Sequence, residues 1–176
     1  MLKPLHQRPL PKDYAGARKL AKKISQSLGK VPDDDFIRAT HQYLTAIIIH
    51  VNHVGRDKTL RGVRDFVFDY GSSGMKKIHL MMNTDHDWQG RKGWNNYEGQ
   101  PTKTNPHVSR VGHMMCEMPE GQRGSIVALA RTALLEMLGE IQTPRIGIGK
   151  GGSGTIPAKT SGKDPKNDLD YLKGVI

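Results

Sequence analysis

The residues best suited to phosphate chemistry lie in a glycine-rich segment, residues 144–154, with the sequence PRIGIGKGGSG. A phosphate loop of the G-x-x-x-x-G-K-[ST] type cradles phosphate with backbone amides and reaches magnesium with a hydroxyl. Here Pro144 stands in place of the first glycine, and Gly151 replaces the hydroxyl residue after Lys150. No buried strand is predicted before the segment, so a remnant NTPase that uses Lys150 is the weakest of the functions considered.

The eight histidines raise the question of a metal site. His50 and His53 share one face of a predicted helix, and His86 lies between two aspartates. Zinc sites pair such ligands with a second cluster at defined spacing, but the chain has one Cys and no H-E-x-x-H motif. Neither a Ser/His/Asp arrangement nor a paired-carboxylate site is found. We therefore expect no metal, no cofactor and no catalytic residue, with the histidines hydrogen-bonded to the backbone.

Aromatic rings and cations alternate in one glycine-rich stretch. The residues concerned are Trp88, Arg91, Lys92, Trp94, Tyr97 and Lys103. This combination suits stacking on single-stranded bases. It equally suits a loop that folds its own apolar cap onto the rest of the domain, which is the interpretation we favour for the stretch. Trp88, Arg91 and Trp94 are the candidate contact residues.

Positive charge is concentrated at the N-terminus. The whole chain carries a net charge of +10, and its first 30 residues hold eight Lys or Arg against Asp13 alone, a net +7. Such a cluster favours an anionic partner, either nucleic acid or an acidic protein face. The alternative is an ordinary solvated helix face. Lys19, Lys22 and Lys23 are the candidates for electrostatic attraction.

Helical periodicity predicts the elements that position these residues. Prolines keep residues 1–12 as an extended basic arm, and Asp13 caps a helix that Gly29 ends. A second helix begins at the acidic residues 33–35 and continues to Val54. Its apolar residues recur every three or four positions, which predicts the buried axis of a bundle rather than a strand.

Four shorter helices are predicted after it. Thr59 caps the third, a turn over residues 71–74 precedes the fourth (75–83), and Asn105 followed by proline begins the fifth, which ends near Glu117. The sixth runs from about residue 119 or 120 to Leu138. Between the fourth and fifth, residues 84–104 have neither helical nor strand periodicity, and so long a loop is usually functional or disordered.

Composition sets the remaining bounds. Hydrophobic residues make up 36% of the chain, and no apolar run approaches the ~20 residues that cross a bilayer. The single Cys fits a reducing compartment. Residues 139–176 contain eight Gly and three Pro, which predicts a flexible tail or a fused segment. The expected fold is all-α: a compact bundle of about six helices over residues 13–138, with one long irregular loop and this Gly-rich C-terminal tail.

Several segments, taken in order and with similar spacing, resemble one known family. They are Ala39-Thr-His-Gln-Tyr-Leu-Thr-Ala46, Lys58-Thr-Leu-Arg-Gly-Val-Arg-Asp-Phe66, Asn83-Thr-Asp-His-Asp-Trp88, Gly93-Trp94, Pro101-Thr-Lys-Thr-Asn-Pro-His-Val108 and Met118 to Ser125. The region from Lys12 to Leu138 is similar to the all-α domain of TraG-like coupling ATPases of bacterial type IV secretion and conjugation. From Gly139 onward the chain departs from the family, which continues into a short helix and a strand, so ATP hydrolysis and hexamer formation by this chain alone are not implied.

The resemblance implies a domain at the cytoplasmic end of a membrane-anchored hexameric ATPase. Its partners would be a relaxase or effector protein, with DNA as a further possibility, and the isolated chain would be monomeric. The expected function is substrate recruitment for translocation by a binding domain that is not itself an enzyme. The alternative is a basic helical nucleic-acid-binding module.

Overall fold

The computed structural model describes residues 7–28, 34–69, 74–96 and 98–141. Within them lie α1 (Tyr14–Ser25), the 3-10 turn η2 (Gln26–Leu28), α2 (Asp34–Val54), α3 (Leu60–Phe68), α4 (Gly74–Met82), α5 (Pro106–Glu117) and α6 (Glu120–Leu138). The only strands in these residues are β1 (Trp94–Asn95) and β2 (Pro101–Thr102). The predicted all-α fold class is therefore confirmed.

Some predictions fall outside the described residues. They are the helix stop at Gly29, the acidic helix start at Asp33, the turn over residues 71–73, the role of Tyr97 and the character of residues 142–176.

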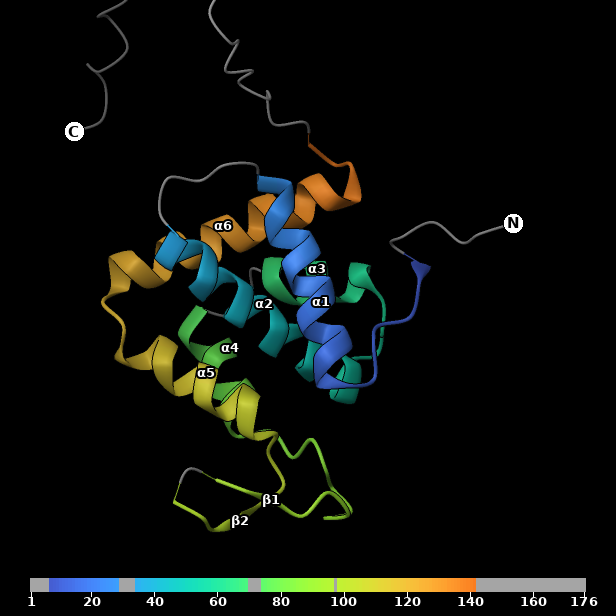
Figure 1. Cartoon of the computed structure of the whole chain (residues 1–176), viewed down its shortest axis with the longest axis vertical. Helices are drawn as coiled ribbons and strands as arrows, with labels where there is room; N and C mark the ends of the chain where they lie inside the picture. Colours follow the sequence, from blue (N-terminus) through green and yellow to red (C-terminus); the bar gives the residue numbers. More distant parts are fainter. Residues whose placement is uncertain (1–6, 29–33, 70–73, 97, 142–176) are drawn as a thin grey trace, which may run out of the picture. The chain divides into compact units, whose positions relative to one another are not determined.

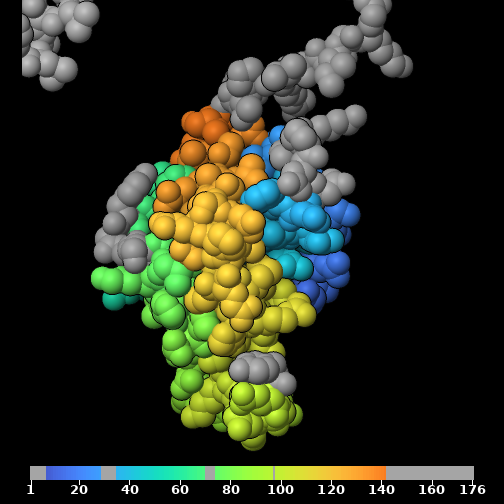
Figure 2. Space-filling view, turned by 90° about the vertical axis from the view of Figure 1, so that its left-hand side faces the viewer, coloured from blue at the N-terminus to red at the C-terminus, as the bar shows by residue number. Residues whose placement is uncertain are grey.

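The long helix α2 is the buried axis of the bundle, as its periodicity predicts (Figure 1). Every residue from Tyr43 to Val51 is buried, and Leu44, Ile47 and Ile48 are fully enclosed. Both α1 and α6 pack against it. Figure 2 shows α6, in yellow to orange, lying along one face of the bundle with the blue N-terminal helices beside it. The three helices share one hydrophobic core, to which α1 contributes Ile24 and α6 contributes Ala130 and Leu134.

A second layer forms where α4 packs against α5. Ile78 and Met81 of α4 and Val108, Val111 and Met115 of α5 are all buried. The two backbones approach closely because Gly112 has no side chain. A Cβ atom on Gly112 would lie 2.1 Å from the Met82 Cγ. This glycine therefore sets the spacing between α4 and α5.

Two of the three predicted N-cap side chains make capping hydrogen bonds. Asp13 accepts a hydrogen bond from the Gly16 amide at 2.7 Å, and Asn105 accepts from the amides of His107 and Val108 at 3.0 and 3.3 Å. Both predicted caps are confirmed. Thr59 occupies the N-cap position of α3, but its side chain makes no capping hydrogen bond. At the other end of the domain, Gly139 adopts φ 73° and ends α6, a left-handed conformation that favours glycine.

The described part of the N-terminal arm docks on the start of α3. The Leu10 amide donates to the Lys58 carbonyl at 2.8 Å, Pro9 forms a bridge with Thr59, and the Leu10 side chain is buried. The bridge at Pro9 agrees with an extended arm, whereas Gln7 belongs to a 3-10 turn, and residues 1–6 of the predicted arm lie outside the described residues.

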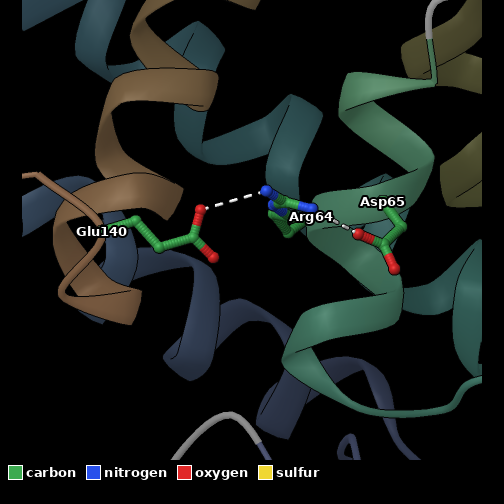
Figure 3. A network of polar contacts seen from close by, with 3 residues as sticks. All are labelled: Arg64, Asp65 and Glu140. Carbon is green, nitrogen blue, oxygen red and sulfur yellow. Dashed lines mark hydrogen bonds and ion pairs between the residues drawn. The ribbon is translucent and has the colours of Figure 1, made fainter.

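Cations tie α3 to its neighbours. The Arg64 guanidinium contacts both Asp65 at 2.8 Å and Glu140, just beyond α6, at 3.1 Å (Figure 3). At the C-terminal end of α3, the Lys77 ammonium donates a hydrogen bond to the Phe66 carbonyl, and the Arg131 guanidinium donates one to the Val67 carbonyl. Positive charge is favourable at this end of a helix. No helix within the described residues is long and apolar enough to cross a membrane.

Candidate functional site

The basic helix α1 has a narrow buried stripe and a broad exposed face. Its buried residues are Ala17, Ala21, Ile24 and Ser25. The three predicted lysines, Lys19, Lys22 and Lys23, are all exposed, and Lys22 and Lys23 lie in the last turn, where the helix dipole favours them. The helix presents its charge to solvent because its core-facing positions are small or apolar.

Part of this face forms one wall of a shallow groove between α1 and α2 with a volume of about 650 Å³. Arg18, Lys19 and Lys22 line it from α1, and Arg38 and His41 line it from α2. The His41 Nε2 lies 2.9 Å from the Arg18 carbonyl oxygen, which fixes the two walls to each other. Lys23 does not line the groove. The structure thus separates Lys19 and Lys22 from Lys23, which sequence reasoning treated alike.

The loop between α4 and α5 is ordered by hydrogen bonds and contains the short β1–β2 pair, which the sequence did not predict. Trp94 pairs with Thr102, and Asn95 with Pro101. The Asn96 side chain accepts from the amides of Glu98 and Gln100 at 3.0 and 2.9 Å. Strands of two residues are too short to show an alternating pattern, so periodicity missed them. The signals that could have revealed the turn are Asn96 and Gly99, which has φ 79°.

Trp88 lies on a tight turn in the same loop. The Gly90 amide donates to the Asp87 carbonyl at 2.9 Å, and the Lys92 amide donates to the Asp87 carboxylate at 2.5 Å. Trp88 itself is 73% exposed. Arg91 is also exposed and follows the turn directly. The turn therefore displays an indole ring and a guanidinium on a backbone held by its own hydrogen bonds.

Trp94 lies differently. It is half-buried, and its ring packs edge-on against His53 of α2, with 6.2 Å between the ring centroids. This position matches the interpretation favoured from the sequence, in which the loop folds an apolar cap onto the helices. Trp88 has the exposure that a contact residue needs, so the two tryptophans have different surroundings.

A buried histidine pair anchors the loop to α2. The His50 Nδ1 lies 3.0 Å from the His86 Nε2, and the Asn105 amide donates to the His86 Nδ1 at 3.2 Å. Because the His86 Nδ1 accepts, its Nε2 carries the proton and donates to His50. Both rings must therefore be neutral.

The surroundings of the pair favour the neutral state. Burial, reinforced by the charge of His53, lowers the pKa of His50 to about 4. Burial lowers the pKa of His86 to about 3, with smaller contributions from His50 and His53. The sequence predicted histidines bonded to the backbone. That holds for His53, whose Nδ1 lies 2.8 Å from the Ile49 carbonyl oxygen, but His50 bonds to another histidine. Among the described residues, no group of three or more side chains could hold a metal ion.

The first turn of α5 lies between the groove of α1 and α2 and the loop that carries Trp88. Tyr14, at the N-terminal end of the groove, packs edge-on against His107 with 4.8 Å between ring centroids. His107 follows Asn105, whose amide bonds to the histidine anchor of the loop. Burial, aided by Arg110, lowers the pKa of His107 to about 4, so this ring adds no positive charge near neutral pH. Figure 1 shows the β1–β2 pair beyond this end of α5.

Comparison with known proteins gives no match to a family model, to a curated protein or to a solved structure.

Proposed function

We propose that this chain is the substrate-recruitment domain of a type IV coupling protein, which binds a relaxase, its DNA complex or an effector protein before translocation. The parent protein would be a membrane-anchored hexameric ATPase, with this domain on the cytoplasmic side. The proposal gives the chain a binding role and no catalytic residue. ATP hydrolysis would belong to the rest of the parent protein.

The observation that carries the proposal is the exposure of Trp88 on an ordered turn. Tryptophan and arginine are enriched among residues that dominate binding energy at protein interfaces. The hydrogen bonds of the turn already hold the backbone at Trp88, so less backbone entropy is lost on binding than in a flexible loop. Trp88 is 73% exposed, and Arg91 lies just beyond the same turn. An exposed indole on an ordered backbone turn supports a role in contacting another molecule.

The placement of the segments that carry the family resemblance is a second support. Residues 83–88 and 101–108 are far apart in sequence, and the hydrogen bond from the Asn105 amide to His86 joins them. The segment of residues 39–46 lies in the buried helix α2. These segments therefore contribute to the core and to the base of the loop that displays Trp88.

Capture of a substrate protein on the immobilised chain tests the proposal. We expect a relaxase or effector of the same secretion system to bind at low salt. Changing Trp88→Ala should weaken binding by about 30-fold, the loss typical of a dominant interface residue. Gln89→Ala, on the same turn, is the matched control and should bind like the wild type. Absence of capture by the wild-type chain at low salt would rule the proposal out.

A basic nucleic-acid-binding module is the second candidate, favoured by the net charge of +10. Binding through phosphates releases counterions, so affinity falls steeply as salt rises. Fluorescence anisotropy of labelled single- and double-stranded DNA across salt concentrations measures this dependence. Salt-sensitive DNA binding without capture of any substrate protein would favour this candidate.

A further inference from the structure

The groove between α1 and α2 concentrates positive charge. Arg18, Lys19 and Lys22 line it from one side, and Arg38 from the other. Among the described residues, no carboxylate lines the groove and none pairs with Arg18, Lys19 or Lys22. Arg38 contacts Asp35 at 2.8 Å, but both side chains are largely exposed. Such an exposed pair is weak, so an incoming carboxylate can replace Asp35.

The shape of the groove selects the kind of anion. Its volume of about 650 Å³ leaves room for a few residues of extended peptide lying along the open groove. The cations lie on the walls of a depression between two helices. A DNA duplex is itself a wide, grooved cylinder and is normally contacted by a protruding element that enters its groove. A recessed site between helices suits a thin chain better.

The other lining residues also suit a peptide. Ala15 and Ile37 add apolar surface that can contact the methylene groups of acidic side chains. Gln26 is exposed and offers an amide for hydrogen bonding to a peptide backbone. Proteins bind single strands largely by stacking bases on aromatic rings. Tyr14 is 46% exposed and packs edge-on against His107, and among the described residues neither Phe nor Trp lines the groove to stack further bases.

We propose that this groove binds an acidic, carboxylate-rich peptide segment of a partner protein, with Arg18, Lys19 and Lys22 pairing with its carboxylates. The inference deepens the proposed recruitment function by naming the chemical class of the bound segment. If overall positive charge alone attracted the partner, any exposed lysine would contribute equally. The proposed site instead requires the lysines that line the groove. Lys23, adjacent in sequence and exposed but outside the groove, should contribute little.

The test uses the full chain and a fluorescein-labelled peptide that alternates Glu and Gly, followed by anisotropy. A peptide with Gln in place of each Glu is the ligand control. We expect binding of the Glu peptide only, with affinity that falls as salt rises. The double variant Lys19→Glu with Lys22→Glu should lose at least about tenfold in affinity. The single variants Lys22→Glu and Lys23→Glu change the net charge equally, so they form a matched pair. We expect Lys22→Glu to lose clearly more peptide affinity than Lys23→Glu.

Folding of each variant is checked by its thermal unfolding curve. If charge reversal prevents folding, Lys19→Ala with Lys22→Ala replaces it, with Lys23→Ala as control. Equal losses for Lys22→Glu and Lys23→Glu would overturn the proposal, since the whole field and not the groove would be responsible. Absence of Glu-peptide binding at low salt would also overturn it.

Nucleic acid is tested in the same assay with a labelled single-stranded DNA of equal charge. Tighter binding of this DNA than of the Glu peptide, lost in the Lys19→Glu, Lys22→Glu variant, would assign the groove to nucleic acid and overturn the peptide proposal. The recruitment function would fail separately, through loss of substrate-protein capture irrespective of the peptide result.

Discussion

His50 and His86 join two segments 36 residues apart through one hydrogen bond between buried rings. Each ring is neutral because burial disfavours its charged form. Protonation of either one would remove the acceptor or place a charge in the core. At the residue scale, this pair is therefore a place where acid is expected to weaken the domain.

We expect the free energy of unfolding to fall as the pH drops below about 6.5. The folded-state pKa of His50 is about 4, below its unfolded value, so the stabilisation is complete above 6.5 and is lost as the pH falls toward 4. Between pH values of about 7.5 and 5, His50 alone accounts for up to ~2 kcal/mol. Urea unfolding at both values measures the loss.

The control for this prediction is His50→Gln, which keeps a polar side chain but cannot titrate. Carboxylates and the other histidines titrate in both proteins, so only the difference between their pH dependences is attributed to His50. Identical pH dependences would contradict the assignment of a depressed pKa to this residue.

At the scale of elements, the spacing of helices depends on side-chain size and their ends depend on capping. Gly112 allows α5 to approach α4, whereas Gly124, in the exposed part of α6, has no atom within 4 Å of the position a Cβ would take. Asn105 caps α5 through two amides, whereas Thr59 makes no such bond at α3. Each feature therefore has a natural control in the same chain.

We predict that Gly112→Ala destabilises the domain by about 1–3 kcal/mol, because the new methyl forces Met82 to move. Gly124→Ala should instead stabilise it by about 0.5–1 kcal/mol, since alanine is the better helix former and meets no neighbour. Denaturant unfolding of both variants gives the comparison. Equal effects of the two substitutions would mean that the close approach of α4 and α5 is absent in solution.

We predict that Asn105→Ala costs about 0.5–2 kcal/mol, because two amides of the first turn of α5 lose their acceptor. Thr59→Ala removes no capping hydrogen bond and should cost less. Thermal unfolding of both variants, with amide exchange at His107 and Val108, measures the effect. Faster exchange at these two amides in Asn105→Ala alone is the expected signature.

At the scale of the whole molecule, exposed apolar surface and charge bear on assembly. The large exposed apolar residues in the described part of the chain are Tyr14, Val54, Leu80, Trp88 and Ile141, which belong to five different segments. Stable dimers generally bury a continuous apolar patch. A net charge of +10 also makes copies of the chain repel each other.

We therefore expect sedimentation equilibrium at moderate salt to give the mass of a monomer, 19.6 kDa. Raising the salt concentration screens the repulsion and should leave the mass unchanged. A mass that rises with protein concentration would show that these apolar residues combine into an interface, and Trp88→Ala would then test whether the exposed indole contributes to it.

The sequence by itself determined the helices and most of their boundaries, because both depend on neighbours in the chain. The periodicity of α2, the caps at Asp13 and Asn105, and the end of α6 at Gly139 are all local features. It also predicted where cations and aromatic rings concentrate. These properties need no knowledge of which helices pack together.

Only the tertiary structure decided how these residues are grouped. It placed Lys19 and Lys22, but not Lys23, on a groove shared with α2, it buried half of Trp94 against His53, and it paired His50 with His86. Each of these outcomes depends on the packing of segments distant in sequence. Side chains with the same local pattern acquire different surroundings only when those segments meet, so no local signal could distinguish them.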